Sequence, residues 1–269
     1  RTKAVLGLGA SEYSVLELEN SGFIKTGILP IAIDESDYNA PSSDVLLDNY
    51  RDKRPLLLFV GRLAPNKRQE DLIKLLYYLR RISPGAHLLL VGRIHHKDYH
   101  SWLTHLCANL GLKDAVTFTN HVSQEEMVTY YRMADLFVSM SEHEGFGKPL
   151  IESMYFEVPV MAYASTAIPS TMGDAGVLFH DKDYEALAEV ADLILQDDKL
   201  RARLVAGQNR RVADFLETSI KRQLQRIMED LEYLPEGGAN GSRGHRASVS
   251  SNHAVSEIKK EANELDLES

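Results

Sequence analysis

The chain has 269 residues, of which 44% are apolar, and 39 acidic against 30 basic side chains give it a formal net charge of -9. This composition is typical of a globular protein with one large core or two smaller ones. The acidic balance and the lack of an arginine-rich stripe disfavour nucleic acid as a partner. No apolar run reaches the roughly 18 residues of a membrane span, and no charged-then-apolar signal sequence opens the chain. The single Cys107 excludes an internal disulfide and favours a reducing, cytoplasmic compartment.

The first 54 residues differ in pattern from the rest. Residues 4–33 alternate as strand, helix over 11–19 and strand over 27–31. Residues 34–54, rich in Asp, Ser and Asn, are typical of a linker with too few apolar side chains for a core of their own. Because Arg1 rather than methionine comes first and an apolar run follows at once, we expect a fragment or a truncated chain.

From Pro55 onward, short apolar runs alternate regularly with amphipathic helix patterns. Helix patterns include 67–82, with leucines on one face, and 123–133, which opens with a capping box of Ser123 and Glu126. The strand-like runs are 56–60, 87–91, 115–119, 135–140, 158–163 and 176–179. This alternation predicts an α/β fold, a Rossmann-like doubly wound parallel sheet with helices on both faces.

A helical segment closes the predicted domain of residues 55–234. Helix patterns cover 184–195, 198–206 and 211–234. After Pro235 the composition shifts to Gly, Ser, Asn, Lys and Glu without aromatic residues, so we expect residues 235–269 to be a disordered tail.

The segment from Glu144 to Glu152 is the most informative motif. Gly145 and Gly147 let the backbone approach a ligand closely, and Pro149 suits the first position of a helix. Free amides at that helix start form an anion site suited to a diphosphate. Carboxylates only accept hydrogen bonds, so Glu144 and Glu152 would face sugar or ribose hydroxyls. The alternative is an ordinary glutamate-rich helix start.

Further candidates follow other predicted strands. Gly61 ends the first strand of the regular region, and Arg62 and Lys67 come next, placed to meet a diphosphate at the carboxyl edge of the sheet. The alternative is two solvated surface cations. Gly92 and Val122 follow the second and third strands and could pass close to a nucleoside, or they could belong to simple turns.

Histidines gather at positions 95, 96, 100 and 105. His96 and His100, four residues apart on a helix pattern, could share a face as zinc ligands do. No Cys or carboxylate completes a set, so we expect a solvated face and no metal site. His143 is interpreted as a loop residue beside the ligand rather than a base.

These motifs together resemble the C-terminal donor-binding domain of the group 1 (family 4) retaining glycosyltransferases, over roughly residues 20–230. The resemblance rests on Gly61-Arg62-Leu63 with Lys67, on the segments 118–123 and 134–138, and on the two-glutamate loop with its Gly-Phe-Gly core. It implies the GT-B fold, of which this chain would supply the C-terminal half. Residues 1–54 would then be a remnant of the acceptor domain and the interdomain linker.

The resemblance also implies roles for individual residues. Arg62 and Lys67 would neutralise the leaving diphosphate, Glu144 would contact the transferred sugar, and Glu152 would hold the ribose. Backbone amides around Phe146, Gly147 and Lys148 would complete the phosphate cradle, and Gly61, Gly92 and Val122 would border the donor.

Two positions depart from the family pattern. Ser170 follows Pro169 where the family has glutamate, and Lys148 stands where relatives often have an apolar residue. Lys148 would add a cation near the phosphates or be a solvated helix start.

The expected function is therefore transfer of a sugar, with retention and without a metal cofactor, from a UDP-, GDP- or similar sugar to a glycan or lipid-linked acceptor. Peripheral association of the full enzyme at the inner face of the membrane is open. A rival is a nucleotide-sugar binding fragment without transferase activity, and we expect the isolated chain to be inactive. A glycosidase using Glu144 and Glu152 is disfavoured, because its carboxylates must face each other across a bond.

Overall fold

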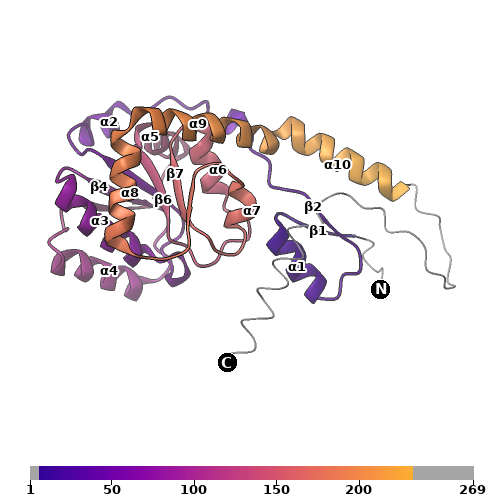
Figure 1. Cartoon of the computed structure of the whole chain (residues 1–269), viewed down its shortest axis with the longest axis horizontal. Coiled ribbons are helices and arrows are strands. Elements are labelled where there is room, and N and C mark those ends of the chain that lie inside the picture. Colours follow the sequence, from indigo (N-terminus) through magenta and orange to yellow (C-terminus); the bar gives the residue numbers. More distant parts are fainter. Residues whose placement is uncertain (1–5, 233–269) are drawn as a thin grey trace. The chain divides into compact units, whose positions relative to one another are not determined.

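Six short apolar strands form one parallel sheet in the computed structural model, which describes residues 6–232 (Figure 1). The predicted tail, residues 235–269, lies outside the described residues. The strands are β3 (Leu56–Val60), β4 (His87–Val91), β5 (Val116–Asn120), β6 (Leu136–Ser139), β7 (Val160–Tyr163) and β8 (Val177–Phe179). Their spatial order is β5-β4-β3-β6-β7-β8, and every neighbouring pair is parallel.

Each crossover between consecutive strands carries a helix, and three more helices follow β8. The helices are α3 (Gln69–Ile82), α4 (Lys97–Asn109), α5 (Gln124–Met133), α6 (Lys148–Tyr155), α7 (Ile168–Met172), α8 (Tyr184–Gln196), α9 (Asp198–Val212) and α10 (Glu217–Glu232). Short 3-10 turns lie at η2 (Pro65–Lys67) and η3 (Ala213–Phe215). The predicted capping box of Ser123 and Glu126 starts α5.

The sheet is covered on both faces because its strands are apolar on both faces. Leu56 and Leu58 of β3 belong to one buried cluster, together with side chains of α5 and α6. Leu57 and Phe59 alternate with them and belong to a second cluster, together with side chains of α3, α4 and α8. The expected Rossmann-like doubly wound fold is therefore confirmed.

The amino-terminal part follows the predicted strand–helix–strand pattern with shorter strands. β1 (Gly7–Gly9) and β2 (Thr26–Ile28) pair in parallel, with α1 (Glu12–Asn20) between them. Ser11 caps α1, because its hydroxyl accepts a hydrogen bond from the Ser14 amide. The assignment of residues 1–54 to an acceptor-domain remnant stays a prediction.

The predicted linker of residues 34–54 contributes to the core of the main sheet. It forms η1 (Glu35–Tyr38) and α2 (Asp44–Asn49), and both Tyr38 and Tyr50 are buried in the cluster that covers α5 and α6. Two aromatic rings bury a large area even in a polar stretch, which is why counting apolar residues underestimated this segment.

Two predicted helix boundaries are wrong. The helix expected at Lys67 begins at Gln69, because Arg68 adopts a left-handed conformation with φ of 53°. The break expected within 206–211 is absent, since α9 runs on to Val212 and the turn falls at 213–216. Buried Gln208 bonds the backbone of Val158 and Val160, and these bonds hold the helix on the sheet.

Gly92 permits the closest approach between two strand ends. Its φ is +146°, and a Cβ at this position would lie 2.2 Å from the carbonyl oxygen of Gly61. Gly111 is a matched contrast, with φ of +69° and no heavy atom within 4 Å of a Cβ.

We expect Gly92→Ala to lower the free energy of unfolding by about 3 kcal/mol or more, because it combines backbone strain with a backbone clash. Gly111→Ala should cost about 1 to 2 kcal/mol, from its left-handed conformation alone. Urea unfolding of both variants measures the difference. Equal losses of stability in the two variants would show that the backbone near Gly61 moves away from the added Cβ at no cost.

Candidate functional site

The strand order reverses between β3 and β6, and the loops that follow these two strands hold most of the predicted site residues. α3 packs on one face of the sheet and α6 on the other, so the carboxyl ends of β3 and β6 lie at the topological switch point of the sheet. Residues 61–67 follow β3, and residues 140–147 follow β6. Ligands of doubly wound sheets bind at such a switch point.

Lys67 and Glu144, predicted from separate motifs, form an ion pair. The Lys67 Nζ lies 2.6 Å from Glu144 Oε1, with side chains only 12% and 20% exposed, respectively. The same ammonium group donates to the carbonyl oxygen of His143 at 3.1 Å. The charge of Lys67 is thus already compensated in this state.

Arg62 stands in contrast as an exposed cation. Its guanidinium makes no hydrogen bond or ion pair with any residue in the range 6–232, although its carbonyl oxygen accepts a bond from Gln69. Gly61, just before it, donates its amide to Val91 across the strand ends. An anion at this edge can therefore bind Arg62 without breaking an existing contact.

The glycine loop leads into α6 as predicted. Gly147 has φ of +88° and directly precedes the helix, and Pro149 occupies its first turn. Within the described residues, the amides of Gly145, Phe146 and Gly147 donate to no other group. The Phe146 side chain is buried, so only its backbone can face a ligand.

The loop after β7 holds the glutamate loop in place, which the sequence did not reveal. The Thr166 hydroxyl bonds both the amide and the carbonyl oxygen of Glu144 at 2.9 Å. Ser165 donates to the Ser141 carbonyl and Thr171 to the Phe146 carbonyl. Thr166 has φ of 45°, an uncommon conformation for a β-branched residue.

The side chain of Ser170, the residue that departs from the family pattern, has a local contact, whereas its backbone has a distant one. Its hydroxyl donates to the Ala167 carbonyl within the same turn, and its own carbonyl accepts from Arg211.

Glu152 lies inside α6, and its carboxylate already has three partners. The hydroxyls of Tyr38 and Tyr131 donate to its two oxygens at 2.8 and 2.6 Å. Lys148 pairs with it along the helix at 3.3 Å. Lys148 is therefore turned toward Glu152, an arrangement that neither sequence interpretation anticipated.

Gly92 and Val122 lie at the same edge of the sheet but have structural contacts. Gly92 packs against Gly61, as described above, and Val122 packs against the cluster of α5 and α6. Whether either borders a ligand stays a prediction.

A buried carboxylate ties the loop after β3 to other strand ends. Asp71 is fully buried at the start of α3 and contacts Arg68 at 3.2 Å, Lys182 at 3.0 Å and the Tyr184 hydroxyl at 2.8 Å. Arg68 and Lys182 both reach Glu142 in the glutamate loop as well. The network therefore sets where η2, and with it Lys67, lies relative to Glu144.

The histidine pair does not share a helical face, because His96 precedes α4 and only His100 lies within it. The His100 ring packs edge-on against Phe118. Among residues 6–232, no three His, Cys, Asp or Glu side chains are grouped as a metal site. No helix in the same range is long and apolar enough to cross a membrane.

Comparison with known proteins identifies the family. The family model described as glycosyl transferases group 1 matches residues 48–211, which is more than half of the chain. The chain belongs to this family, which confirms the resemblance drawn from its motifs.

Two curated relatives illustrate the similarity. A GDP-mannose-dependent alpha-(1-6)-phosphatidylinositol monomannoside mannosyltransferase of Mycolicibacterium smegmatis is 31% identical over 166 residues, covering 58% of this chain and 43% of that protein. A D-inositol 3-phosphate glycosyltransferase of Stackebrandtia nassauensis is 31% identical over 168 residues, covering 60% of this chain and 38% of that protein. The chain thus spans about two fifths of the length of these relatives.

Solved structures share the fold. HepE of Anabaena, crystallised with UDP and glucose, superposes with a TM-score of 0.74 at 22% identity, covering 84% of this chain and 64% of that one. The sucrose-phosphate synthase of Thermosynechococcus elongatus gives a TM-score of 0.70 at 25% identity, covering 86% and 59%, respectively.

The Asp71 network predicts a pH-dependent stability. Burial would raise the pKa of the Asp71 carboxyl, but hydrogen bonds from Lys182 and Tyr184 and the charge of Arg68 hold the pKa below its ordinary value. The resulting stability is fully present above the unfolded carboxyl pKa of about 4 and is lost as the pH falls below it. Asp71→Asn should lower the free energy of unfolding at neutral pH by about 1 to 3 kcal/mol, because it weakens charge-assisted hydrogen bonds at a buried carboxylate, although Arg68 and Lys182 keep Glu142 as a partner.

Urea unfolding between neutral pH and pH 3 measures both effects, and Asp71→Asn should flatten the acid limb of the curve. Asp48→Asn is the matched control, since Asp48 is 67% exposed in its pair with Arg51. That control should change stability by less than about 1 kcal/mol. An unchanged acid limb in Asp71→Asn would contradict the assignment.

Proposed function

We propose that this chain is the donor-binding half of a retaining, family 4 glycosyltransferase that uses a nucleotide sugar without a metal cofactor. The observation that carries the proposal is the placement of charged groups where the strand order reverses between β3 and β6. There an uncommitted Arg62, the pair of Lys67 and Glu144, and the amino end of α6 lie at one edge of the sheet. The UDP and glucose bound by HepE, a protein of the same fold, fit this ligand class.

The proposed roles follow from the chemistry of each group. Arg62 offers a planar fork and Lys67 a compact charge to the diphosphate, and the amides before α6 add neutral donors. These groups supply the positive field that a divalent cation gives other transferases. Glu144, beside Lys67, accepts hydrogen bonds from the transferred sugar, and Glu152 accepts them from the ribose.

Retention is proposed because both carboxylates, Glu144 and Glu152, are assigned to accept hydrogen bonds from hydroxyls, so neither is left to act as the base. The departing diphosphate is then the group left to take the proton of the incoming hydroxyl, on the face from which it leaves. Arg62 and Lys67 would stabilise the negative charge that develops there.

The acceptor is proposed to be a glycan or lipid-linked sugar, as in the mannosyltransferase of M. smegmatis and the O-antigen chain mannosyltransferase B of Escherichia coli. We place the enzyme in the cytoplasm, with peripheral contact at the inner face of the membrane.

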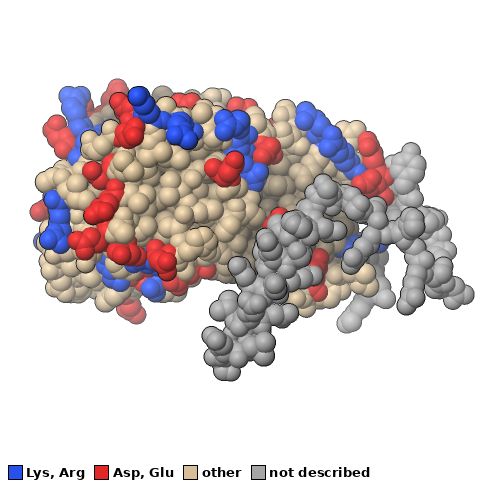
Figure 2. All heavy atoms as spheres, viewed as in Figure 1, with Lys and Arg blue, Asp and Glu red and all other residues tan. Residues whose placement is uncertain are grey.

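On the face drawn in Figure 2, Lys and Arg are interspersed with Asp and Glu, which argues against a basic surface for binding nucleic acid.

The rival function is a nucleotide-sugar binding module without transferase activity. A donor site alone does not hold the second substrate that transfer requires.

Nucleoside diphosphates should bind this chain with the same affinity in the presence and absence of EDTA. Arg62→Ala should weaken UDP or GDP by about tenfold to a hundredfold, since a hydrogen bond to a charged group contributes about 1.5 to 3 kcal/mol. Calorimetry with both nucleotides is the measurement. The matched control is Arg81→Ala, because Arg81 is exposed near the far end of α3. Binding that disappears on chelation, or equal losses in both variants, would contradict the proposal.

Transfer should require an acceptor domain, because holding two reactants together can lower the barrier by about 7 to 11 kcal/mol. We expect the chain alone to bind donor and hydrolyse it slowly at most. Joined to a preceding Rossmann-like domain, it should transfer sugar with retention, read by proton NMR of the product anomer. An inverted product would refute the mechanism, and a bound but inert donor in the two-domain form would favour the binding module.

A further inference from the structure

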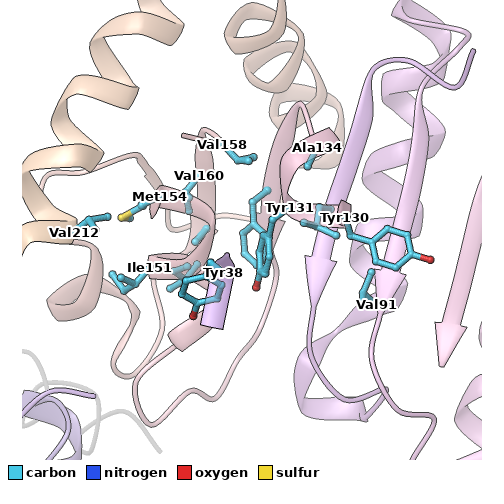
Figure 3. Close-up of a cluster of buried hydrophobic side chains, with 14 of the residues drawn as sticks. Tyr38, Val91, Tyr130, Tyr131, Ala134, Ile151, Met154, Val158, Val160 and Val212 are labelled. Carbon is cyan, nitrogen blue, oxygen red and sulfur yellow. The ribbon is translucent and has the colours of Figure 1, made fainter. Parts of the chain in front are cut away.

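The carboxylate of Glu152 is held from two directions by buried phenols. Tyr38 donates to Oε1 at 2.8 Å, and Tyr131 donates to Oε2 at 2.6 Å, so each oxygen receives one tyrosine proton. In Figure 3 the hydroxyls of Tyr38 and Tyr131 are directed toward the same side of the cluster, whereas the hydroxyl of neighbouring Tyr130 points away. Tyr38, Tyr131 and Glu152 come from three separate elements, η1, α5 and α6, respectively.

The two tyrosines are buried and remain protonated. Tyr131 is fully buried and Tyr38 is 4% exposed. Their rings both pack on Phe156, Tyr131 stacked at 5.3 Å and Tyr38 edge-on at 5.4 Å. Burial and the negative charge of Glu152 raise the pKa of both phenols above the usual value, so neither loses its proton near neutral pH. Each hydroxyl therefore has one proton and one fixed direction in which to donate it.

The two tyrosines leave part of the acceptor capacity of the carboxylate unused. Its two oxygens offer about four acceptor positions, of which the tyrosines use two. Lys148 approaches Oε1 at 3.3 Å, and its side chain is 39% exposed. The Glu152 side chain itself is 13% exposed, so part of it is accessible to a ligand.

We propose that Tyr38 and Tyr131 are positioning residues for ribose recognition, which fix the plane of the Glu152 carboxylate so that its free acceptor positions face the two ribose hydroxyls. The inference rests on the proposed function, in which Glu152 holds the ribose. It adds that Tyr38, from the segment predicted to be a linker, determines donor affinity without touching the donor.

A purely structural cluster would have the same contacts, so the test must separate the two roles. A positioning role acts only on ligands that carry ribose hydroxyls, because their loss removes the groups that Glu152 accepts from. A structural role would weaken every nucleotide equally. The decisive comparison is therefore a ribonucleotide against its 2′,3′-dideoxy counterpart.

The experiment is calorimetric binding of UDP and GDP, and of their dideoxy counterparts, to the full chain and to Tyr38→Phe and Tyr131→Phe. Each substitution removes one hydroxyl and keeps the ring. We expect the ribonucleotide to bind about threefold to tenfold more weakly, as for loss of one hydrogen bond, and the dideoxy nucleotide to bind as before.

Two neighbouring tyrosines provide matched controls. Tyr155 packs against Tyr38, and Tyr130 precedes Tyr131, yet neither hydroxyl makes a hydrogen bond to a residue in the range 6–232. Tyr155→Phe and Tyr130→Phe should leave both nucleotide affinities unchanged. Thermal unfolding identifies any variant that has lost its fold, and Tyr38→Phe alone is sufficient for the test.

A double-mutant cycle with Glu152→Ala completes the experiment. Tyr38→Phe should have no further effect on ribonucleotide affinity once the carboxylate is gone. Equal losses for ribo- and dideoxynucleotides, or a full effect of Tyr38→Phe in the Glu152→Ala background, would overturn the inference alone. Failure of the unaltered chain to bind any nucleoside diphosphate would overturn the proposed function and the inference with it.

Discussion

Strands β3 and β6 are parallel neighbours in the sheet, although two strands and three helices separate them along the chain. Because the helices that follow them pack on opposite faces, the two following loops lie at the switch point of the sheet. Every charged residue proposed to meet the phosphates or the sugar comes from these loops. The backbone hydrogen bond from Glu142 to Asn66 keeps the loops in register, so the site depends on this single strand pairing.

Positive and negative side chains are nearly balanced at the carboxyl edge of the sheet. The existing ion pairs therefore determine which cation can bind a phosphate without losing a partner. Lys67 is paired with Glu144, and Arg68 and Lys182 are paired with Asp71 and Glu142. Arg62 alone among these cations has no partner in the described part of the chain. A diphosphate would thus meet Arg62 first and would have to compete with Glu144 for Lys67. That exchange would release the Glu144 carboxylate for a sugar hydroxyl, which couples recognition of the phosphate and of the sugar.

The sequence predicted those elements of the fold that depend on the spacing of residues close together in the chain. The six strands, the start of α5 and the glycine-bracketed turn into α6 all follow from apolar periodicity, capping and glycine chemistry within a few residues. The glutamates were found because they lie on one short segment. Their partners were not, because Tyr38 is 114 residues from Glu152 and Thr166 is 22 residues from Glu144. Side-chain contacts over such separations follow from tertiary packing and leave no periodic signal.

The segment of residues 34–54 shows why polarity alone misleads about a connection. Its Asp, Ser and Asn residues are typical of a linker. In the structure, however, the amide of Ile33 just before it donates to the Phe215 carbonyl, and Tyr38 and Tyr50 are buried against the sheet. Tyr38 extends this anchoring to the carboxylate of Glu152, which is also proposed to bind the ribose. Loss of stability does not distinguish the packing role of the Glu152 carboxylate from its proposed role in binding, because replacing it would affect both. Only a ligand that lacks the matching hydroxyls separates the two contributions.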